Sequence, residues 1–169
     1  MAESGTRSDT EISIVSDLEI MMSRTFSAPR ELVYQACTQP RHMAQWWGPR
    51  GYTLPVCEMD VRPGGAYHFV QRGTDGSDHP FSGVFREVVP PERLVMTQIY
   101  EPYPDNELVV TINFRDLGNG QTRLEEHMLF DSVQSRDGMV AAGMEAGARD
   151  SMDRLAELLQ AMQGHERRR

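Results

Sequence analysis

The sequence contains no lysine, so all seventeen of its basic residues are arginines. This excludes mechanisms that need a lysine amine, either as a Schiff-base nucleophile or as a general base. The chain also lacks an apolar run of the roughly 18 residues that a membrane span requires. Its polar first ten residues lack the apolar region of a signal peptide. Together these absences predict a cytoplasmic protein with no membrane span.

Residues that bind metals or activate substrates are also scarce. Only two cysteines occur, Cys37 and Cys57, without a C-x-x-C pair. Free thiols are expected, although a disulfide between them stays open. The five histidines show no H-E-x-x-H motif and no helical pair, and no phosphate-binding loop or G-x-S-x-G motif occurs. We therefore predict no metal site and no cofactor.

The charge balance narrows the range of partners. The formal net charge is −8, whereas proteins that bind a phosphate backbone present a concentrated basic surface. Nucleic acid is therefore not an expected partner. Apolar residues make up 39% of the 169 positions, which is enough for the core of one domain.

Composition divides the chain into three parts. Residues 1–16 are rich in Ser, Thr, Glu and Asp and are predicted to be a flexible leader. Residues 17–163 carry the periodic apolar patterns and are predicted to form a single domain. Residues 164–169 end in three arginines and are expected to be a frayed tail.

Hydrophobic periodicity predicts the order of the secondary-structure elements. Alternation over 18–26 indicates a strand, and Pro29 and Pro40 each suit the first turn of a short helix, the second ending at Trp46-Trp47. A period of two then predicts six strands, at about 54–61, 65–72, 80–89, 93–100, 107–115 and 121–130. The turns between them are short, so neighbouring strands must be antiparallel. A stripe with period 3.6 predicts a final helix over about 142–163.

These elements indicate an α+β fold with a seven-stranded curved antiparallel sheet around a long C-terminal helix. The two short helices lie between the first and second strands. A curved sheet has more apolar surface on its concave face than one helix covers, so a cavity is expected between the long helix and the short helices.

Candidate ligand-binding residues are the aromatic, methionine and polar side chains with inward parity on the predicted strands and helices. They are Trp46, Trp47, Tyr67, Phe69, Phe81, Phe85, Met96, Gln98, Ile112, Phe114, Glu126, Met128, Met144 and Met152. Methionine side chains adapt to irregular shapes, which suits a ligand pocket, but they also fill gaps in an ordinary core.

Inward carboxylates are the candidates for catalysis, because burial can raise a carboxyl pKa toward neutrality. Glu126 lies between Leu124 and Met128, and Glu87 shares the parity of Phe85. The alternative is a purely structural carboxylate paired with an arginine such as Arg62 or Arg72.

Four separated motifs resemble one known family. They are Ala28-Pro29-Arg30-Glu31-Leu32-Val33, Trp46-Trp47-Gly48-Pro49, Asp60-Val61-Arg62-Pro63-Gly64-Gly65 and Val89-Pro90-Pro91-Glu92-Arg93-Leu94. The chain resembles the activator of Hsp90 ATPase homologue-like branch of the START/SRPBCC superfamily over about residues 18–162. The resemblance implies the helix-grip fold of birch-pollen-allergen-like proteins, a hydrophobic cavity and, in many members, dimers.

The leading functional hypothesis is the binding of a small hydrophobic molecule, lipid-like or aromatic, in the cavity. One alternative is an enzyme of the aromatase/cyclase or hydrolase type that uses Glu126 or Glu87 as its base. Another is an interaction module that binds an Hsp90-type chaperone or pairs with itself. The sequence does not identify the ligand or the oligomeric state.

Overall fold

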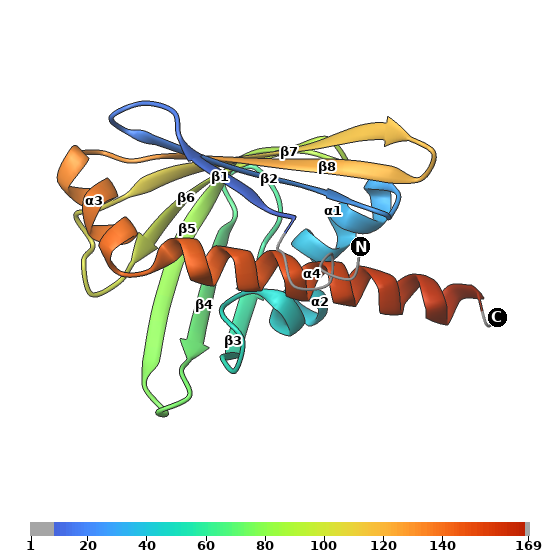
Figure 1. The fold of residues 1–169 in the computed structure, drawn as a ribbon. Coiled ribbons are helices and arrows are strands. Elements are labelled where there is room, and N and C mark those ends of the chain that lie inside the picture. Colours follow the sequence, from blue (N-terminus) through green and yellow to red (C-terminus); the bar gives the residue numbers. More distant parts are fainter. Residues whose placement is uncertain (1–8, 168–169) are drawn as a thin grey trace.

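The computed structural model describes residues 9–167, which form an eight-stranded antiparallel sheet and four helices (Figure 1). The strands lie in the order β1-β2-β8-β7-β6-β5-β4-β3. The strands are β1 (Glu11–Ile14), β2 (Glu19–Phe26), β3 (Thr53–Met59), β4 (Ala66–Arg72), β5 (Asp78–Val89), β6 (Arg93–Tyr100), β7 (Leu108–Gly118) and β8 (Gln121–Leu129). The helices are α1 (Arg30–Thr38), α2 (Pro40–Trp46), α3 (Val133–Ala141) and α4 (Met144–Arg167).

The α+β fold with a curved antiparallel sheet is confirmed, but the sheet has eight strands rather than seven. The additional strand is β1, which lies within the predicted leader and pairs with β2, so that Ile14 faces Ile20. Three of its four residues are exposed. A strand that buries so little has a weak apolar alternation, so the sequence pattern did not reveal it. Residues 1–8 lie outside the described part of the chain.

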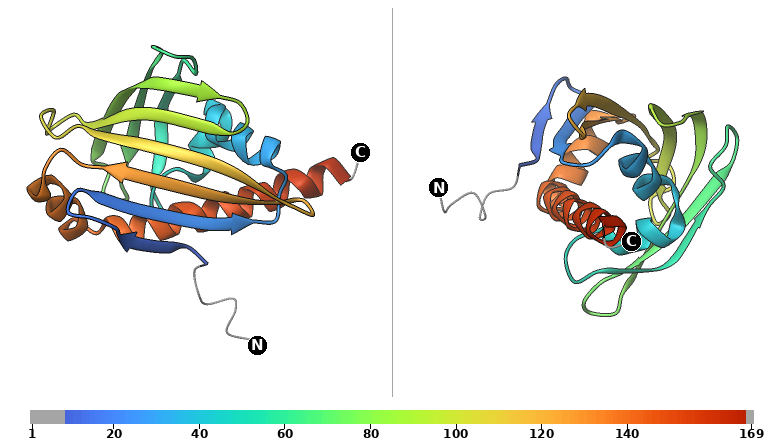
Figure 2. Two further views of the ribbon diagram at one scale, coloured as in Figure 1. Left: turned by 90° about the horizontal axis from the view of Figure 1, so that it is seen from above. Right: turned by 90° about the vertical axis from the view of Figure 1, so that its right-hand side faces the viewer.

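The sheet bends around α4, which is seen end-on inside the curve in Figure 2. The inner face of the sheet and one stripe of α4 form a continuous core. Its most completely buried side chains include Ile20, Phe85, Leu94, Phe114, Leu124, Met152, Leu155 and Leu159. Two patterns predicted from the sequence, the period of two in the strands and the stripe with period 3.6, therefore face each other as expected.

Helices α1 and α2 cover the part of the concave face that α4 leaves open. Pro40 occupies the first turn of α2, where its missing N–H removes no helical hydrogen bond. The indole Nε1 of Trp46 donates a hydrogen bond to the carbonyl oxygen of Ala36 at 2.9 Å, which joins the two helices. After α2, the Gly48 N–H donates to Ser151 Oγ of α4 at 2.8 Å.

The segment before the long helix contains a separate short helix that the sequence did not predict. Ser132 caps α3 by accepting a hydrogen bond from the Ser135 N–H, and none of the residues of α3 is buried. Gly143 then adopts a φ of +89°, which interrupts the helical path before α4 begins. Helix α4 extends to Arg167, beyond the predicted end at 163, and residues 168–169 lie outside the described range.

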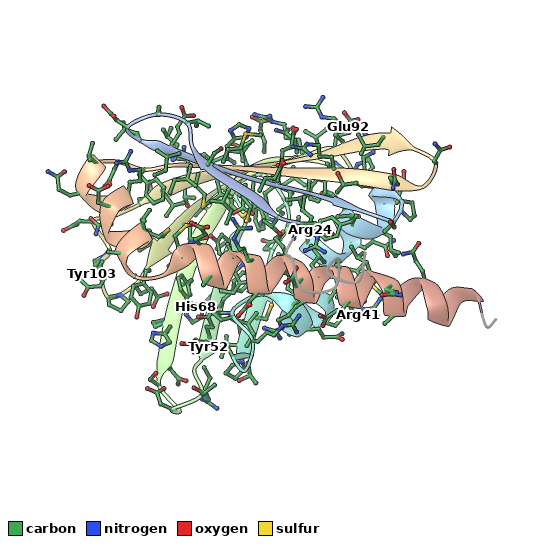
Figure 3. The ribbon with its side chains drawn as sticks, viewed as in Figure 1. Arg24, Arg41, Tyr52, His68, Glu92 and Tyr103 are labelled. Atoms are coloured by element: carbon green, nitrogen blue, oxygen red, sulfur yellow. The ribbon has the colours of Figure 1, made fainter. Side chains whose placement is uncertain are left out.

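An ion pair between a largely buried arginine and a half-buried aspartate joins α4 to strand β2. Arg24 of β2, labelled in Figure 3, is paired with Asp153 of α4 and is largely buried. Charged groups are rarely buried without a partner, so this pair defines how α4 lies against β2. No helix within residues 9–167 is long and apolar enough to cross a membrane.

Candidate functional site

A small cavity of about 50 Å³ lies between the concave face of the sheet and helices α1 and α2. Side chains fill most of the space between the sheet and α4, as Figure 3 shows. The cavity is lined by Cys37, Met43, Trp46, Trp47, Met59, Tyr67, Phe69, Phe85, Met96, Gln98, Val110, Ile112 and Glu126. The prediction that the long helix borders the cavity is wrong, because none of the described side chains of α4 lines it. The cavity is also much smaller than a usual ligand pocket of about 300–1,000 Å³.

Nine of the fourteen predicted ligand-binding residues line this cavity, and five do not. Phe81 lies behind Trp47, which its ring meets edge-on at a centroid distance of 5.1 Å. Phe114 packs against Tyr34 of α1 at 5.3 Å. Met128 and Met152 are buried in the core, and Met144 is half-buried at the start of α4. Inward parity selects a whole sheet face, whereas the cavity occupies only part of that face.

The two adjacent tryptophans have different environments. Trp46 is buried, and its hydrogen bond to Ala36 anchors α2. Trp47 meets the rings of Phe69 and Phe81 edge-on, each at 5.1 Å. Both indoles border the cavity. Trp46 therefore has a structural role at the edge of the cavity, whereas Trp47 packs against the aromatic rings of β4 and β5.

The ring of Tyr67 packs over Gly83 of the neighbouring strand β5. A Cβ atom built on Gly83 would lie 2.0 Å from the carbonyl oxygen of Thr97 and 2.5 Å from the Tyr67 ring. Only glycine therefore allows the ring to lie flat over β5. The Tyr67 hydroxyl donates a hydrogen bond to that same carbonyl oxygen at 2.6 Å. This bond occupies the hydroxyl proton and leaves the aromatic ring facing the cavity.

Glu126 is the charged residue of the lining. It lies on β8, opposite Met22 of β2 and Ile112 of β7, and protein surrounds its carboxyl group. Burial raises the pKa of Glu126 to about 7. The alternative of a structural carboxylate paired with an arginine does not apply to Glu126, since Arg62 and Arg72 pair with Asp60 and Asp78 on the surface. It does apply to Glu87, which pairs with Arg93.

Neither polar side chain of the cavity, Glu126 or Gln98, forms a hydrogen bond or ion pair with any residue of the described chain. Both keep some accessible surface, and both border the cavity. Their polar atoms are therefore available to a molecule inside it. A carboxyl group with a pKa near 7 can also give or accept a proton at neutral pH.

The prediction that Glu87 points inward is wrong. The register of β5 against β6 shifts between Phe85 and Glu87, which is a β-bulge. The bulge inserts one residue, so Val88 rather than Glu87 packs against the core. Glu87 is exposed and pairs with Arg93, with 3.1 Å between Oε1 and Nε. It therefore lies outside the cavity.

Four residues of the lining were not predicted from the sequence. Cys37 and Met43 belong to the short helices, and Val110 lies two residues before Ile112 on β7. Met59 faces the cavity because the register of β3 shifts between Thr53 and Val56. The inward parity of Ile112 could have identified Val110, whereas the direction of Met59 depends on the irregularity in β3.

The two cysteines are free thiols, as expected. Burial raises the pKa of both, that of Cys57 to about 11. A thiol protonated at neutral pH is a poor nucleophile. The cavity therefore offers no activated cysteine among the residues described.

A second depression, of about 410 Å³, lies on the outer surface where β7 meets the start of α1 and β6. It is lined mainly by charged and polar residues: Arg30, Glu92, Arg93, Asn113, Phe114, Arg115 and Asp116. Arg93 donates to Asn113, and Arg115 pairs with Glu125, so these groups already have partners. Its mixed charges and open shape make it a poor site for an apolar ligand.

Comparisons with known proteins agree with this architecture. The chain is 30% identical to a protein of Chromobacterium violaceum, covering 85% of this chain and 98% of that one with a TM-score of 0.74. It is 26% identical to a protein of Nitrosomonas europaea, covering 89% and 99% with a TM-score of 0.80. Comparison with curated proteins gives no match. The family profile described as activator of Hsp90 ATPase homolog 1-like protein matches residues 27–160, and the chain therefore belongs to that family.

Proposed function

We propose that the protein binds a small, largely apolar molecule with one polar group in the cavity that contains Glu126. The observation that carries this proposal is the unpaired carboxyl of Glu126 inside an apolar cavity. An unpaired buried carboxyl costs folding free energy, because burial removes its hydration without supplying a partner. A bound molecule that contacts the carboxyl would offset this cost.

The lining supports a ligand with an apolar body. Met43, Met59 and Met96 supply flexible apolar surface, and the rings of Tyr67, Phe69 and Phe85 form one wall. Burial of ligand surface contributes roughly 25 cal/mol per Å² of apolar area. Gln98 and Glu126 would then orient the polar group.

The volume of the cavity limits the size of the ligand. At about 50 Å³ it is smaller than the 150 Å³ engineered cavity that holds benzene. Binding even one aromatic ring therefore requires the cavity to expand, for which the three methionine side chains are suited. A long-chain lipid would need a much larger rearrangement, so a compact molecule fits the structure better.

A thermal-shift screen followed by native mass spectrometry tests the proposal. We expect compact molecules with one polar group to raise the unfolding temperature and to bind with a stoichiometry of one. The variant Ile112→Phe, which adds volume to the lining, should abolish binding, and Val84→Phe on the exposed outer face of β5 should not. Circular dichroism would verify that both variants fold.

Two outcomes would overturn the proposal. One is the absence of a stabilising compound across a library of small aromatic and aliphatic molecules. The other is a ligand whose affinity is the same in folded Ile112→Phe as in the unmodified protein, since that ligand would bind elsewhere.

A further inference from the structure

Among the side chains that the structure describes, those of residues 9–164, none is a positive partner for the carboxyl of Glu126. Arg24 is the most deeply buried of the described arginines that form ion pairs, and it pairs with Asp153 of α4. Arg115 and Arg123 lie on the outer face of the sheet, where both pair with Glu125. The side chains of residues 9–164 thus provide no counter-charge for the carboxyl in the cavity.

The walls around Glu126 suit a cation better than an anion. The ring centroid of Tyr67 lies 5.0 Å from that of Phe69 and 5.6 Å from that of Phe85. Trp47 in turn packs against Phe69. The faces of aromatic rings carry negative electrostatic potential and attract ammonium groups. An anionic ligand would instead be repelled by the ionised carboxyl.

We propose, on the basis of the binding function above, that the ligand is a compact amine whose protonated nitrogen contacts the Glu126 carboxylate. The ammonium group would supply the absent counter-charge, and its N–H groups would donate to the carboxylate oxygens. The apolar part of the amine would lie against the methionines and aromatic rings. Pairing inside a water-poor cavity gives a stronger electrostatic interaction than the same pair would have in water.

The pH response of amine binding is set by Glu126 alone. Among the described residues, the ionisable groups that interact with its charge are Cys37 of α1 and Tyr67 of β4. Burial, followed by the charge of Glu126, raises the pKa of both, so both stay neutral at neutral pH. The strands on either side place Met22 and Ile112 opposite Glu126. Since burial raises the pKa of Glu126 to about 7, its ionised fraction changes near neutrality.

Isothermal titration calorimetry with benzylamine, benzyl alcohol and toluene tests the inference, because these probes share one apolar body. At about pH 8, benzylamine should bind about tenfold more tightly than benzyl alcohol. Its affinity should fall about tenfold between about pH 8 and about pH 6, as Glu126 becomes protonated. The affinities of the two neutral probes should not fall in this way.

The variant Glu126→Gln should remove both the preference for benzylamine and its pH dependence, whereas the exposed control Glu87→Gln should retain both. Circular dichroism would verify that each variant is folded. Binding of the neutral probes without a preference for benzylamine would overturn the amine inference and leave the proposed function intact. If no probe binds and the wider library also fails, the proposed function itself is overturned. A benzylamine preference that persists in Glu126→Gln would also overturn the inference.

Discussion

Glu125 and Glu126 are adjacent on β8, yet the two faces of the sheet give their carboxyl groups opposite properties. Glu125 faces outward, where Arg115 lies 2.8 Å and Arg123 lies 3.2 Å from its oxygens. Hydrogen bonding to Arg115 is the main cause that lowers the pKa of Glu125. Glu126 faces inward without a partner, and burial raises its pKa to about 7. One step along a strand therefore separates a carboxylate paired with arginines from a carboxyl group that borders the cavity.

The largest expected effect comes from the apolar side chains of the same two faces. On β5, Phe85 is 1% exposed and its neighbour Val84 is 42% exposed. Phe85→Ala should reduce the free energy of unfolding by about 4 kcal/mol, because it removes a buried ring and leaves a cavity. Val84→Ala should change it by less than about 0.5 kcal/mol. Urea denaturation measures both, and similar losses would contradict the assignment of the two faces.

Glu126→Gln should increase stability at alkaline pH. A raised pKa means that the native protein binds a proton more tightly than the unfolded chain, so stability falls as pH rises from about 4.5 through about 7. Glutamine cannot ionise and avoids this loss. The variant should be more stable than the unmodified protein by about 3 kcal/mol above this range and nearly equal below it. Urea midpoints across pH measure the difference, and a constant difference would contradict it.

Replacing a glycine should have a moderate effect on the inner face. Gly83→Ala should cost about 2 kcal/mol, because its Cβ would overlap the Thr97 carbonyl and the Tyr67 ring. The matched control is Gly138→Ala in α3, where nothing lies within 4 Å and alanine favours a helix by up to about 1 kcal/mol. Thermal unfolding should therefore shift in opposite directions for the two variants. Equal shifts would show that Tyr67 is not held as described.

Glu125→Gln should have a small effect, with a loss of roughly 0.5–1 kcal/mol at neutral pH. Its lowered pKa stabilises the native state above the unfolded pKa, and this contribution disappears as pH falls through the folded pKa. The loss of stability should therefore vanish in acid. Glu126→Gln should instead show a gain in stability, which appears as the pH rises toward neutrality. Urea midpoints at acid and neutral pH test this, and a loss that persists in acid would contradict an ionic origin.

The sequence predicted most of the fold because binary patterning reflects burial directly. The alternation in β4 and β8 and the stripe on α4 identified Tyr67, Phe69, Leu124 and Met152 as inward residues, and all four are buried. Exposed elements were missed, since β1 and α3 bury few side chains and carry weak patterns. Periodicity therefore reveals only the elements that contribute to the core.

The candidate site was predictable only in part, because register irregularities change which residues face inward. The parity of β8 placed Glu126 inward, and the structure agrees. The same reasoning failed for Glu87, since the bulge after Phe85 reverses the parity in the middle of β5. A bulge depends on pairing with a distant strand, so a local pattern does not reveal it.

The sequence by itself determined the class of fold and the inward position of Glu126. It also excluded any mechanism that uses a lysine side chain. These follow from local periodicity and composition. Only the tertiary structure decided that Glu126 has no arginine partner among the described side chains and that the cavity is small. Both depend on which side chains from distant segments fill the same space, and that packing follows from contacts among several elements at once.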